Sequence, residues 1–395
     1  MSLRILMLLE NNAYHKDVRV RNEAQSLVAN GYNVTVICPR AKADEPAQET
    51  IDGVHIRRYP SPPEGDGLVG YVLEYGFSLL TALWLSLREL FSRGFDVIHA
   101  HNPPDVYVLL AMMYKLIGKR FVFDHHDLSP ELYYYARFDG KGNKLVYRML
   151  VFFENLSCRI ADKVIATNQS YKDMQIERAG IPAEKSFIVR NGPNLEKLRV
   201  PETLTTTRDA NAPITIGYLG IIGFQDGADV LVRAVQHLYH NMGYRNFHCK
   251  IAGSGDALDS VKALAHELDV ADCITFTGWV NYQDIPEVMS SFDICAAPEL
   301  SNVYADKSTV IKMMEYMAFG KPIVAFDLPE HRYSAGDAAL YATDNDPAKL
   351  AEKIAQLIDD PALREQLGTI GKERIDTHLS WSQQEKELLR LYGSF

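Results

Sequence analysis

Three residues, Ser308, Lys312 and Glu315, have the types and spacing to bind an anion beside a sugar. Apolar residues recur at helical spacing from Ser308 to Phe319, which predicts a helix with Ser308 as N-cap and these three side chains on one face. A helix N-terminus attracts anions and disfavours cations, yet Lys307 and Lys312 both lie there. A bound diphosphate would remove this conflict, and Glu315 could then accept hydrogen bonds from a ribose diol. An exposed Lys312–Glu315 ion pair is the alternative that the local pattern leaves open.

Strand-like and helix-like segments alternate along the whole chain, which predicts parallel sheets flanked by helices. A polar, irregular stretch interrupts this alternation at 195–213, and the pattern then restarts, as expected for a second sheet with its own core. The predicted organisation is a first Rossmann-like domain (1–194), a linker (195–213), a second Rossmann-like domain (214–379) and a polar C-terminal helix (380–395) that crosses back to the first domain.

Two histidine-rich segments follow predicted strands in the first half. Asp96–His99 leads into His101 and Asn102, and Arg120–Asp124 leads into His126 and Asp127. Because ligands bind beyond the carboxyl ends of parallel strands, these side chains are candidate hydrogen-bonding or base groups. Histidines satisfied by backbone are the plainer alternative. A metal site is disfavoured, since no HExxH motif or cysteine partner accompanies them.

Glycine-rich turns join strands to helices in the second half. They are Gly217–Gly223, Ala252–Gly255 and Thr277–Val280, and we expect them to let backbone approach a ligand at the same sheet edge as Ser308. By contrast, Glu10–His15 follows the first strand without a GxGxxG sequence, so a dinucleotide fingerprint is absent there.

Composition describes an ordinary soluble chain of 395 residues, 47% hydrophobic and 23% charged, for which two domains are the natural expectation. The net charge is −10, with 23 Lys and Arg against 22 Asp and Glu in residues 1–195 and 18 against 29 in the remainder. This acidic balance argues against nucleic acid as a partner. No signal peptide is expected, and the five scattered cysteines favour reduced thiols in a cytoplasmic protein.

Two apolar segments raise the question of a membrane. Leu68–Phe91 contains Glu74, Arg88 and Glu89, so it is predicted to be a buried or interfacial helix and not a membrane span. Lys144–Ile160 is sharply amphipathic, with basic residues beside an apolar stripe. Packing of that stripe on the sheet is the first interpretation, and contact with a membrane surface is the second.

Several runs of residues together resemble one known family, glycosyltransferase family 4, over nearly the full length. They are Asp17-Val18-Arg19-Val20 with Glu23-Ala24, Phe123-Asp124-His125-His126-Asp127-Leu128-Ser129-Pro130-Glu131, Val189-Arg190-Asn191-Gly192 and Glu315-Tyr316-Met317-Ala318-Phe319-Gly320-Lys321-Pro322. The resemblance implies an α/β fold of GT-B architecture, with two Rossmann-like parallel-sheet domains facing a central cleft. It looks most like a bacterial branch that builds surface polysaccharides on lipid-linked acceptors.

The resemblance implies a retaining transferase that binds a nucleotide diphosphate-sugar, expected to be a UDP-sugar, in the second domain. Glu315 matches the second glutamate of the E-x7-E motif, which binds ribose, and His126 matches the histidine near the transferred sugar. The predicted catalytic residues are His126, Asp127, Asp306 and Lys312. The predicted donor-binding residues are Gly220, Gly223, Gly253, Val280, Lys307, Ser308, Thr309 and Glu315. The predicted acceptor-side residues are Asn12, Asp17, Arg19, His101 and Asn102.

The chain also departs from the family pattern. Lys307 stands where the first motif glutamate is expected, and Asp226-Gly227 stands where the family has Lys-Gly. We hypothesise that the diphosphate-binding cation has moved to Lys312 and that Asp306 contacts sugar hydroxyls in place of the glutamate. The expected acceptor is a glycan or polyprenyl-diphosphate-linked sugar at the inner membrane surface.

No metal or other cofactor is expected, because the helix N-terminus and Lys312 would stabilise the leaving diphosphate. The DxD sequence Asp344-Asn345-Asp346 precedes a predicted helix at Pro347 and is interpreted as an N-cap. Three alternatives stay open: a nucleotide-sugar epimerase or hydrolase of the same architecture, a degenerate transferase that acts as a binding subunit, and a purely structural two-domain protein.

Overall fold

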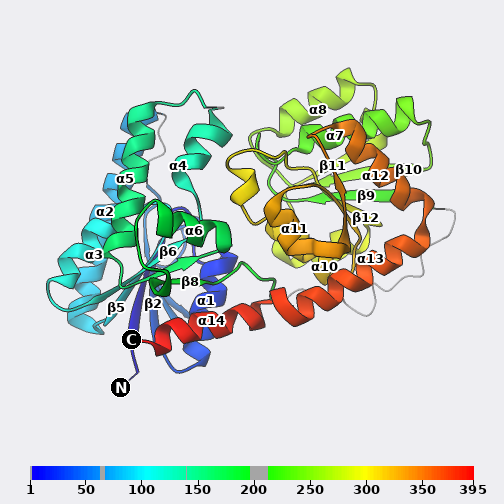
Figure 1. Ribbon diagram of the computed structural model, residues 1–395. Coiled ribbons are helices and arrows are strands. Elements are labelled where there is room, and N and C mark those ends of the chain that lie inside the picture. Colours follow the sequence, from blue (N-terminus) through cyan, green and yellow to red (C-terminus); the bar gives the residue numbers. More distant parts are fainter. Residues whose placement is uncertain (1, 63–66, 139, 196–211) are drawn as a thin grey trace. The chain divides into compact units, whose positions relative to one another are not determined.

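A computed structural model describes residues 2–62, 67–138, 140–195 and 212–395, which form two compact units (Figure 1). The first unit runs to Asn191 and also includes residues 384–395; the second comprises Gly192–Gln383. The division falls three residues before the predicted boundary. The amide of Trp381 donates to the carbonyl of Pro193 at 3.0 Å, which ties this segment to the second unit. Most of the predicted linker lies outside the described residues.

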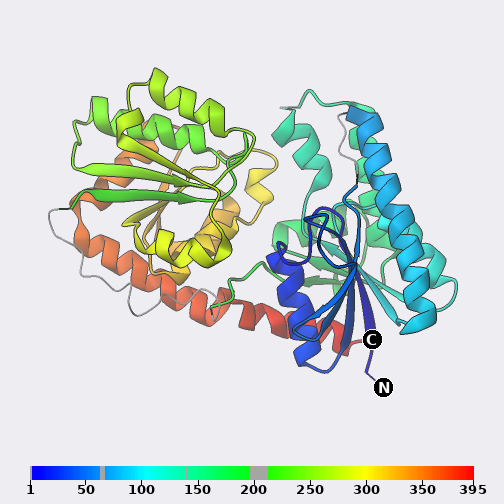
Figure 2. The same ribbon diagram turned by 180° about the vertical axis from the view of Figure 1, so that it is seen from behind.

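The first unit is built on an eight-stranded sheet with the order β3-β4-β2-β1-β5-β6-β7-β8, parallel except for the edge pair β3 and β4. Its strands are β1 (Arg4–Leu8), β2 (Asn33–Pro39), β3 (Gln48–Ile51), β4 (Val54–Tyr59), β5 (Val97–His101), β6 (Arg120–His125), β7 (Lys163–Ala166) and β8 (Ser186–Ile188). Its helices are α1 (Val18–Ala29), α2 (Gly67–Ser92), α3 (Tyr107–Lys115), α4 (Ser129–Glu131), α5 (Lys144–Ile160) and α6 (Gln169–Glu177). Figures 1 and 2 show α2, α3 and α5 along one face of the sheet and α1 along the other.

The second unit is built on a six-stranded parallel sheet with the order β11-β10-β9-β12-β13-β14. Its strands are β9 (Ile214–Leu219), β10 (Phe247–Ala252), β11 (Ile274–Gly278), β12 (Ile294–Ala297), β13 (Ile323–Phe326) and β14 (Ala339–Ala342). Its helices are α7 (Ala228–Gln236), α8 (Leu258–Glu267), α9 (Ile285–Ser290), α10 (Ile311–Ala318), α11 (Pro329–Ala335), α12 (Pro347–Asp359) and α13 (Pro361–Arg374). The last helix, α14 (Trp381–Gly393), ends within the first unit, where Tyr392 lies against His99.

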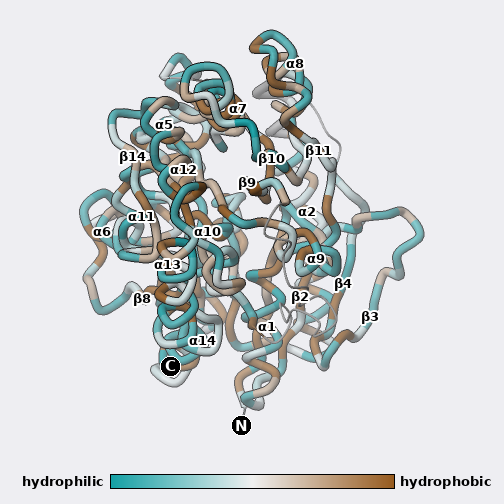
Figure 3. Tube along the Cα trace, turned by 90° about the vertical axis from the view of Figure 1, so that its right-hand side faces the viewer, coloured by the Kyte–Doolittle hydropathy of each residue, from teal (hydrophilic) through white to brown (hydrophobic). Residues whose placement is uncertain are grey.

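The second sheet is apolar on both faces because helices cover both. Alternate residues of a strand point to opposite faces, so β9 places Ile216 and Tyr218 in one core cluster and Leu219 in the other. Hydrophobic stretches along β9 and β10 are visible in Figure 3. The second cluster contains Met313 and Met317 from α10, and this packing fixes the helix against the carboxyl end of β12.

The outer faces of α2 and α5 are apolar in places. In the described part of the chain no helix combines the length and the hydropathy that crossing a membrane requires. In α2, Leu80, Trp84 and Phe91 are exposed, whereas Ala82 and Leu85 point into the core. The prediction of a helix in this segment is thus confirmed, and one side of it is buried, whereas an interfacial position stays a prediction.

Candidate active site

The ammonium of Lys312 lies at the centre of a buried polar cluster in the second unit. Lys312 belongs to the first turn of α10, and its Nζ lies 2.5 Å from Glu299 Oε1 and 3.0 Å from the hydroxyl of Tyr218. The ammonium also lies 4.2 Å from the centroid of the Tyr218 ring, which adds cation–π attraction. Burial disfavours the charged form of Lys312. The field of Glu299, with smaller contributions from Tyr218 and Asp226, outweighs burial and holds the pKa of Lys312 well above its ordinary value.

The turn after β9 brings backbone directly against the Lys312 side chain. A Cβ on Gly220 would lie 3.2 Å from Lys312 Cε and 3.4 Å from its Nζ, so a larger residue here would crowd the end of the lysine side chain. The hydroxyl of Tyr218 donates to the carbonyl of Ile221 at 2.5 Å, which ties the cluster to the turn. A Cβ on Gly253 would collide with the carbonyl oxygen of Gly220. Two of the three predicted glycine turns therefore meet beside Lys312.

Asp226 explains how the turn keeps its shape without the lysine expected there. Its Oδ2 accepts a hydrogen bond from the amide of Gly223 at 2.9 Å, so the carboxylate closes the turn. Its charge also stabilises the Lys312 ammonium. With Asp226 in place of the expected lysine, the turn lacks one positive charge, but the carboxylate of Asp226 stabilises the positive charge of Lys312.

Glu315 lies one turn beyond Lys312 on the same helix and is partly buried. Burial raises the pKa of its carboxyl to about 7, and the neighbouring Lys312 offsets this only in part. Near neutral pH the carboxyl is therefore divided between its protonated and ionised forms. The ionised form has two oxygens that accept hydrogen bonds, as a diol requires.

The predicted N-cap of the helix, Ser308, was wrong by two residues. Ala305–Lys307 form a separate 3-10 turn, and the hydroxyl of Ser308 donates back to the carbonyl of Tyr304 at 3.0 Å. Val310 is the N-cap of α10 and offers no side-chain hydrogen bond. The Ser308 hydroxyl therefore stabilises the preceding turn and not the helix.

The other predicted residues of the second unit surround this helix start. Asp306, in the 3-10 turn with Lys307, has a buried Oδ1 without a hydrogen-bond partner among the described residues. The hydroxyl of Thr309 donates to Glu330 Oε2 at 3.1 Å. Val280 packs on the methionine-rich core beside α10. The role of Val280 as a donor contact stays a prediction.

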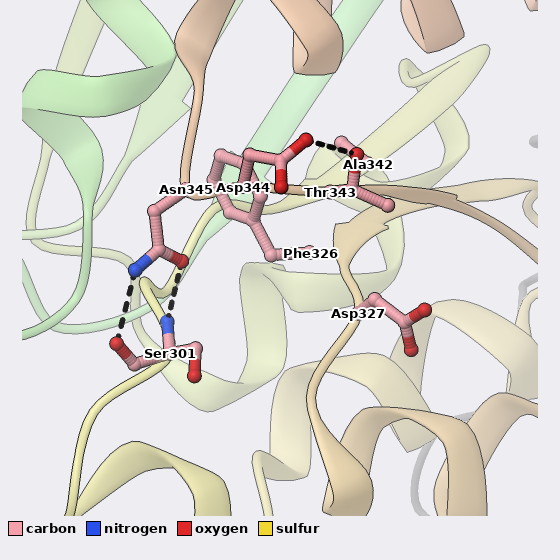
Figure 4. A pocket seen from close by; sticks show the side chains of 7 residues that line it. All are labelled: Ser301, Phe326, Asp327, Ala342, Thr343, Asp344 and Asn345. Atoms are coloured by element: carbon pink, nitrogen blue, oxygen red, sulfur yellow. Dashed lines mark hydrogen bonds between the residues drawn. The ribbon is translucent and has the colours of Figure 1, made fainter.

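A separate cavity of about 460 Å³ opens near the carboxyl ends of β13 and β14 (Figure 4). Its lining residues are Ser301, Phe326, Asp327, Ala342, Thr343, Asp344 and Asn345. The Asn345 side chain bridges the amide and carbonyl of Ser301 at 2.8 and 3.0 Å. Asp346 accepts a hydrogen bond from Ala348 at the start of α12, so the N-cap interpretation of the DxD sequence is confirmed.

A second buried polar cluster lies in the first unit around Asp124, at the end of β6. Arg19 of α1 binds both carboxylate oxygens of Asp124, through Nε at 2.7 Å and Nη2 at 2.8 Å, and Nη2 lies 3.1 Å from Glu23. Burial opposes ionisation of Asp124, but Arg19 and then His126 outweigh it and hold the pKa of Asp124 well below its ordinary value. Arg19 is thus enclosed by its partners, and its contact with an acceptor stays a prediction.

His126 is held as a cation by this cluster. Its Nδ1 lies 3.4 Å from Asp124 Oδ2, and although burial lowers the pKa of His126, the Asp124 carboxylate raises it to about 9. Asn102 fixes the backbone there, because its Oδ1 accepts from the amides of His126 and Asp127 at 2.7 and 3.0 Å. A protonated His126 is a hydrogen-bond donor near neutral pH, and its role as a hydrogen-bonding or base group stays a prediction. Burial also raises the pKa of Asp127.

The strand predicted to end at His99 extends to His101, so both histidines lie within β5. Strand residues two apart share a face, so the two rings stack with centroids 4.3 Å apart. His101 Nδ1 lies 2.9 Å from Asp124, and His99 Nδ1 lies 2.9 Å from the Tyr392 hydroxyl. Both histidines are fully buried, and contact of His101 with an acceptor stays a prediction.

One group of potential metal ligands occurs among the described residues: Glu23, His99, His101 and Asp124 offer ligand atoms that all lie within 4.8 Å of one another. The guanidinium of Arg19 already lies against both carboxylates of this group. Because the cluster contains its own cation, the residues do not fit a divalent metal and we assign none.

The remaining acceptor-side predictions differ in outcome. Asn12 is exposed in the turn after β1, where a contact with an acceptor stays a prediction. Asp17 is the N-cap of α1, and its Oδ1 accepts from the amide of Val20 at 2.9 Å. The carboxylate of Asp17 therefore has a structural role that the sequence analysis did not consider.

Two partners of Lys312 escaped prediction. Glu299 follows β12 by two residues, and Tyr218 lies inside β9. Neither belongs to a spacing pattern with Lys312. The only indication in the sequence was that Lys312 lies near a predicted helix N-terminus, where a cation is disfavoured. That conflict predicts an anion nearby but does not identify the residue or ligand that supplies it.

The chain has two α/β units, each built on a largely parallel sheet, and the second unit places the Lys312 ammonium beside its glycine turns. This is the GT-B architecture. The chain is a glycosyltransferase: residues 17–197 match Glycosyltransferase Family 4, and residues 213–360 match Glycosyl transferases group 1. It belongs to these transferases over most of its length.

Curated relatives and solved structures agree with this family. An uncharacterized glycosyltransferase of Methanocaldococcus jannaschii is 24% identical over 392 residues, covering 95% of this chain and 93% of the relative. A D-inositol 3-phosphate glycosyltransferase of Kineococcus radiotolerans is 24% identical, with 95% and 89% coverage.

Among solved structures, sucrose-phosphate synthase of Thermosynechococcus elongatus superposes with a TM-score of 0.80 at 17% identity, covering 99% and 98% of the two chains. HepE of Anabaena, solved in complex with UDP, gives 0.73 at 17% identity and full coverage of both chains. At this identity the structural likeness establishes the fold alone.

Proposed function

We propose that this glycosyltransferase moves a sugar, with retention of anomeric configuration, from a nucleotide diphosphate-sugar to a glycan or polyprenyl-diphosphate-linked acceptor. The proposed donor is a UDP-sugar, and the proposed pathway is bacterial surface polysaccharide synthesis. The observation that carries the proposal is the Lys312 ammonium held against Gly220, with Glu315 one helical turn away. Support for the donor also comes from HepE, which was solved with UDP and with UDP-glucose.

The chemistry proposed for the second unit is stabilisation of the leaving group. Breaking the glycosidic bond places negative charge on the diphosphate, and a preorganised cation lowers the free energy of that transition state. Lys312 supplies such a cation and has three N–H donors, of which two bind Glu299 and Tyr218. The third remains for a phosphate oxygen. No metal ion is required in this scheme, because the lysine carries out the charge neutralisation.

The first unit has the complementary role in this proposal. A protonated His126 can donate a hydrogen bond to a sugar hydroxyl or to a phosphate oxygen of the acceptor. Asp124 lies beside the His126 ring and is itself bound by Arg19, so both are positioning residues for His126.

We expect binding of the nucleoside diphosphate to depend on pH through Glu315. The carboxyl must lose its proton to accept two ribose hydroxyls, and its pKa is about 7 in the free protein. Binding therefore strengthens as pH rises through 7, and the dissociation constant of UDP should be about tenfold larger at pH 6 than at pH 8. Isothermal titration across this range measures the effect.

The Glu315→Gln variant is the control for this titration. Protonation of the diphosphate itself occurs near pH 6 and affects both proteins equally. The dissociation constant of UDP for the variant, divided by that for the wild type, should therefore change with pH. The variant should bind UDP more weakly than the wild type at pH 8. Equal pH dependence in the two proteins would contradict the assignment of Glu315 to the ribose.

We further propose that the protein is cytoplasmic and binds the inner membrane surface through α5. The apolar stripe of α5 packs on the core only in part: Phe153 and Leu156 do so, but Leu145 and Phe152 are 61% and 60% exposed. Lys144 and Arg148 are exposed on the same helix. Apolar side chains flanked by cations suit an anionic lipid surface.

Charge reversal tests this membrane contact. The double variant Lys144→Glu/Arg148→Glu should lose at least tenfold in affinity for vesicles containing anionic lipid, because each cation near such a surface contributes about 1 kcal/mol. The matched control is Lys262→Glu/Lys372→Glu, which reverses two exposed cations in the second unit. Vesicle co-sedimentation measures both, and equal losses would contradict a specific role for α5.

A further inference from the structure

Glu299 stands in the donor site without any role in the proposed transfer. It follows β12, is buried, and places Oε1 2.5 Å from Lys312 Nζ. Its other oxygen, Oε2, has no hydrogen-bond partner among the described residues, and His331 Nε2 lies 3.8 Å from it. A buried carboxylate in a site for a diphosphate repels the ligand, so its presence calls for an explanation.

The contacts around Lys312 suggest what the carboxylate does. Tyr218 links the ammonium to the carbonyl of Ile221, and Gly220 lies beside its Cε and Nζ. Glu299 therefore holds a buried cation at the glycine turn before any ligand arrives. A buried lysine without a carboxylate would tend to lose its proton or turn toward water.

We propose that Glu299 is a positioning residue that both preorganises the Lys312 ammonium and weakens its hold on the nucleoside diphosphate product. This inference rests on the proposed function. While Glu299 remains bound to the ammonium, part of the positive charge is already neutralised, so a diphosphate binds less tightly than it would to an unpaired lysine. The product can then leave the site at a useful rate.

The substitution Glu299→Gln separates this role from a structural one. The amide keeps the size and a hydrogen-bond acceptor but removes the charge, so the diphosphate becomes the main anion near Lys312. We expect the variant to bind UDP about tenfold more tightly than the wild type, and turnover to fall several-fold because product release slows. Damage to the fold would weaken UDP binding, whereas the proposed role predicts tighter binding, so the direction of the change in affinity distinguishes the two roles.

Two further variants complete the test by isothermal titration with UDP. Glu299→Asp retains the charge and should bind UDP within about threefold of the wild type. Asp293→Asn removes a carboxylate near the amino end of β12, where Asp293 accepts from the amide of Thr215 at 2.7 Å, and should leave the affinity unchanged. If Glu299→Gln binds UDP as the wild type does, or less tightly, the inference is overturned. If the wild type binds no nucleoside diphosphate, the proposed function fails with it.

Discussion

Replacement of Lys312 by methionine is expected to lower the rate of sugar transfer by about 100- to 1000-fold. Methionine keeps the length of the side chain but cannot stabilise the charge that develops on the diphosphate, and the loss of one preorganised donor has effects of this size in other enzymes. The loss should appear mainly in kcat, because the charge grows in the transition state. Initial rates of nucleoside diphosphate release in the presence of acceptor measure it.

The control for this variant is Lys321→Met. Lys321 is another partly buried lysine of the second unit, and its Nζ donates to the carbonyl of Phe292 at 2.6 Å, away from the glycine turns. Its loss should change transfer less than threefold. Comparable losses in both variants would show that a general weakening of the unit, and not the cation at Gly220, causes the effect.

Replacement of Asp124 by alanine is expected to lower the free energy of unfolding of the first unit by about 3–5 kcal/mol. The substitution leaves the buried guanidinium of Arg19 without its bidentate partner, so that Glu23 at 3.1 Å is its remaining carboxylate neighbour. Removing one partner of a buried ion pair has a cost of this size. His126 loses its anion as well, so its pKa should fall from about 9. Hydrogen exchange of the β5 and β6 amides measures the stability, because the two units need not unfold together.

Glu387→Ala is the matched control for this loss of stability. Glu387 forms an ion pair with Arg390 on α14, and both side chains are exposed, so removal should change the free energy of unfolding by less than about 1 kcal/mol. If the β5 and β6 amides were protected from exchange equally in Asp124→Ala and in the wild type, the Arg19 cluster would not stabilise this unit.

The alternation of strands and helices could be predicted because most strands are short apolar runs with helices between them. Prediction failed where polar side chains are buried. The predicted strand ends at His99, whereas β5 continues to His101, and both histidines are buried on the same face of the strand. A strand that ends in buried histidines cannot be distinguished from a loop by hydropathy alone.

The chemistry of the site could be predicted in part. Lys312 was singled out because a cation conflicts with a helix N-terminus, and its position beside Gly220 supports that choice. Its partner Glu299 lies 13 residues away, and Asp124 lies 105 residues from Arg19. Pairs at such separations depend on how strands are ordered in a sheet, which a single sequence does not reveal.

The most direct test of the proposed function is transfer by the wild-type protein. It would be incubated with UDP-sugars, with and without a polyprenyl-diphosphate-linked sugar in detergent, while NMR follows release of UDP and the anomeric configuration of the product. We predict release of UDP only with acceptor present, and a new linkage with the configuration of the donor. Release of UDP without acceptor would identify a hydrolase. A donor altered at one carbon would identify an epimerase, and binding of UDP without turnover on any acceptor would favour a non-catalytic subunit.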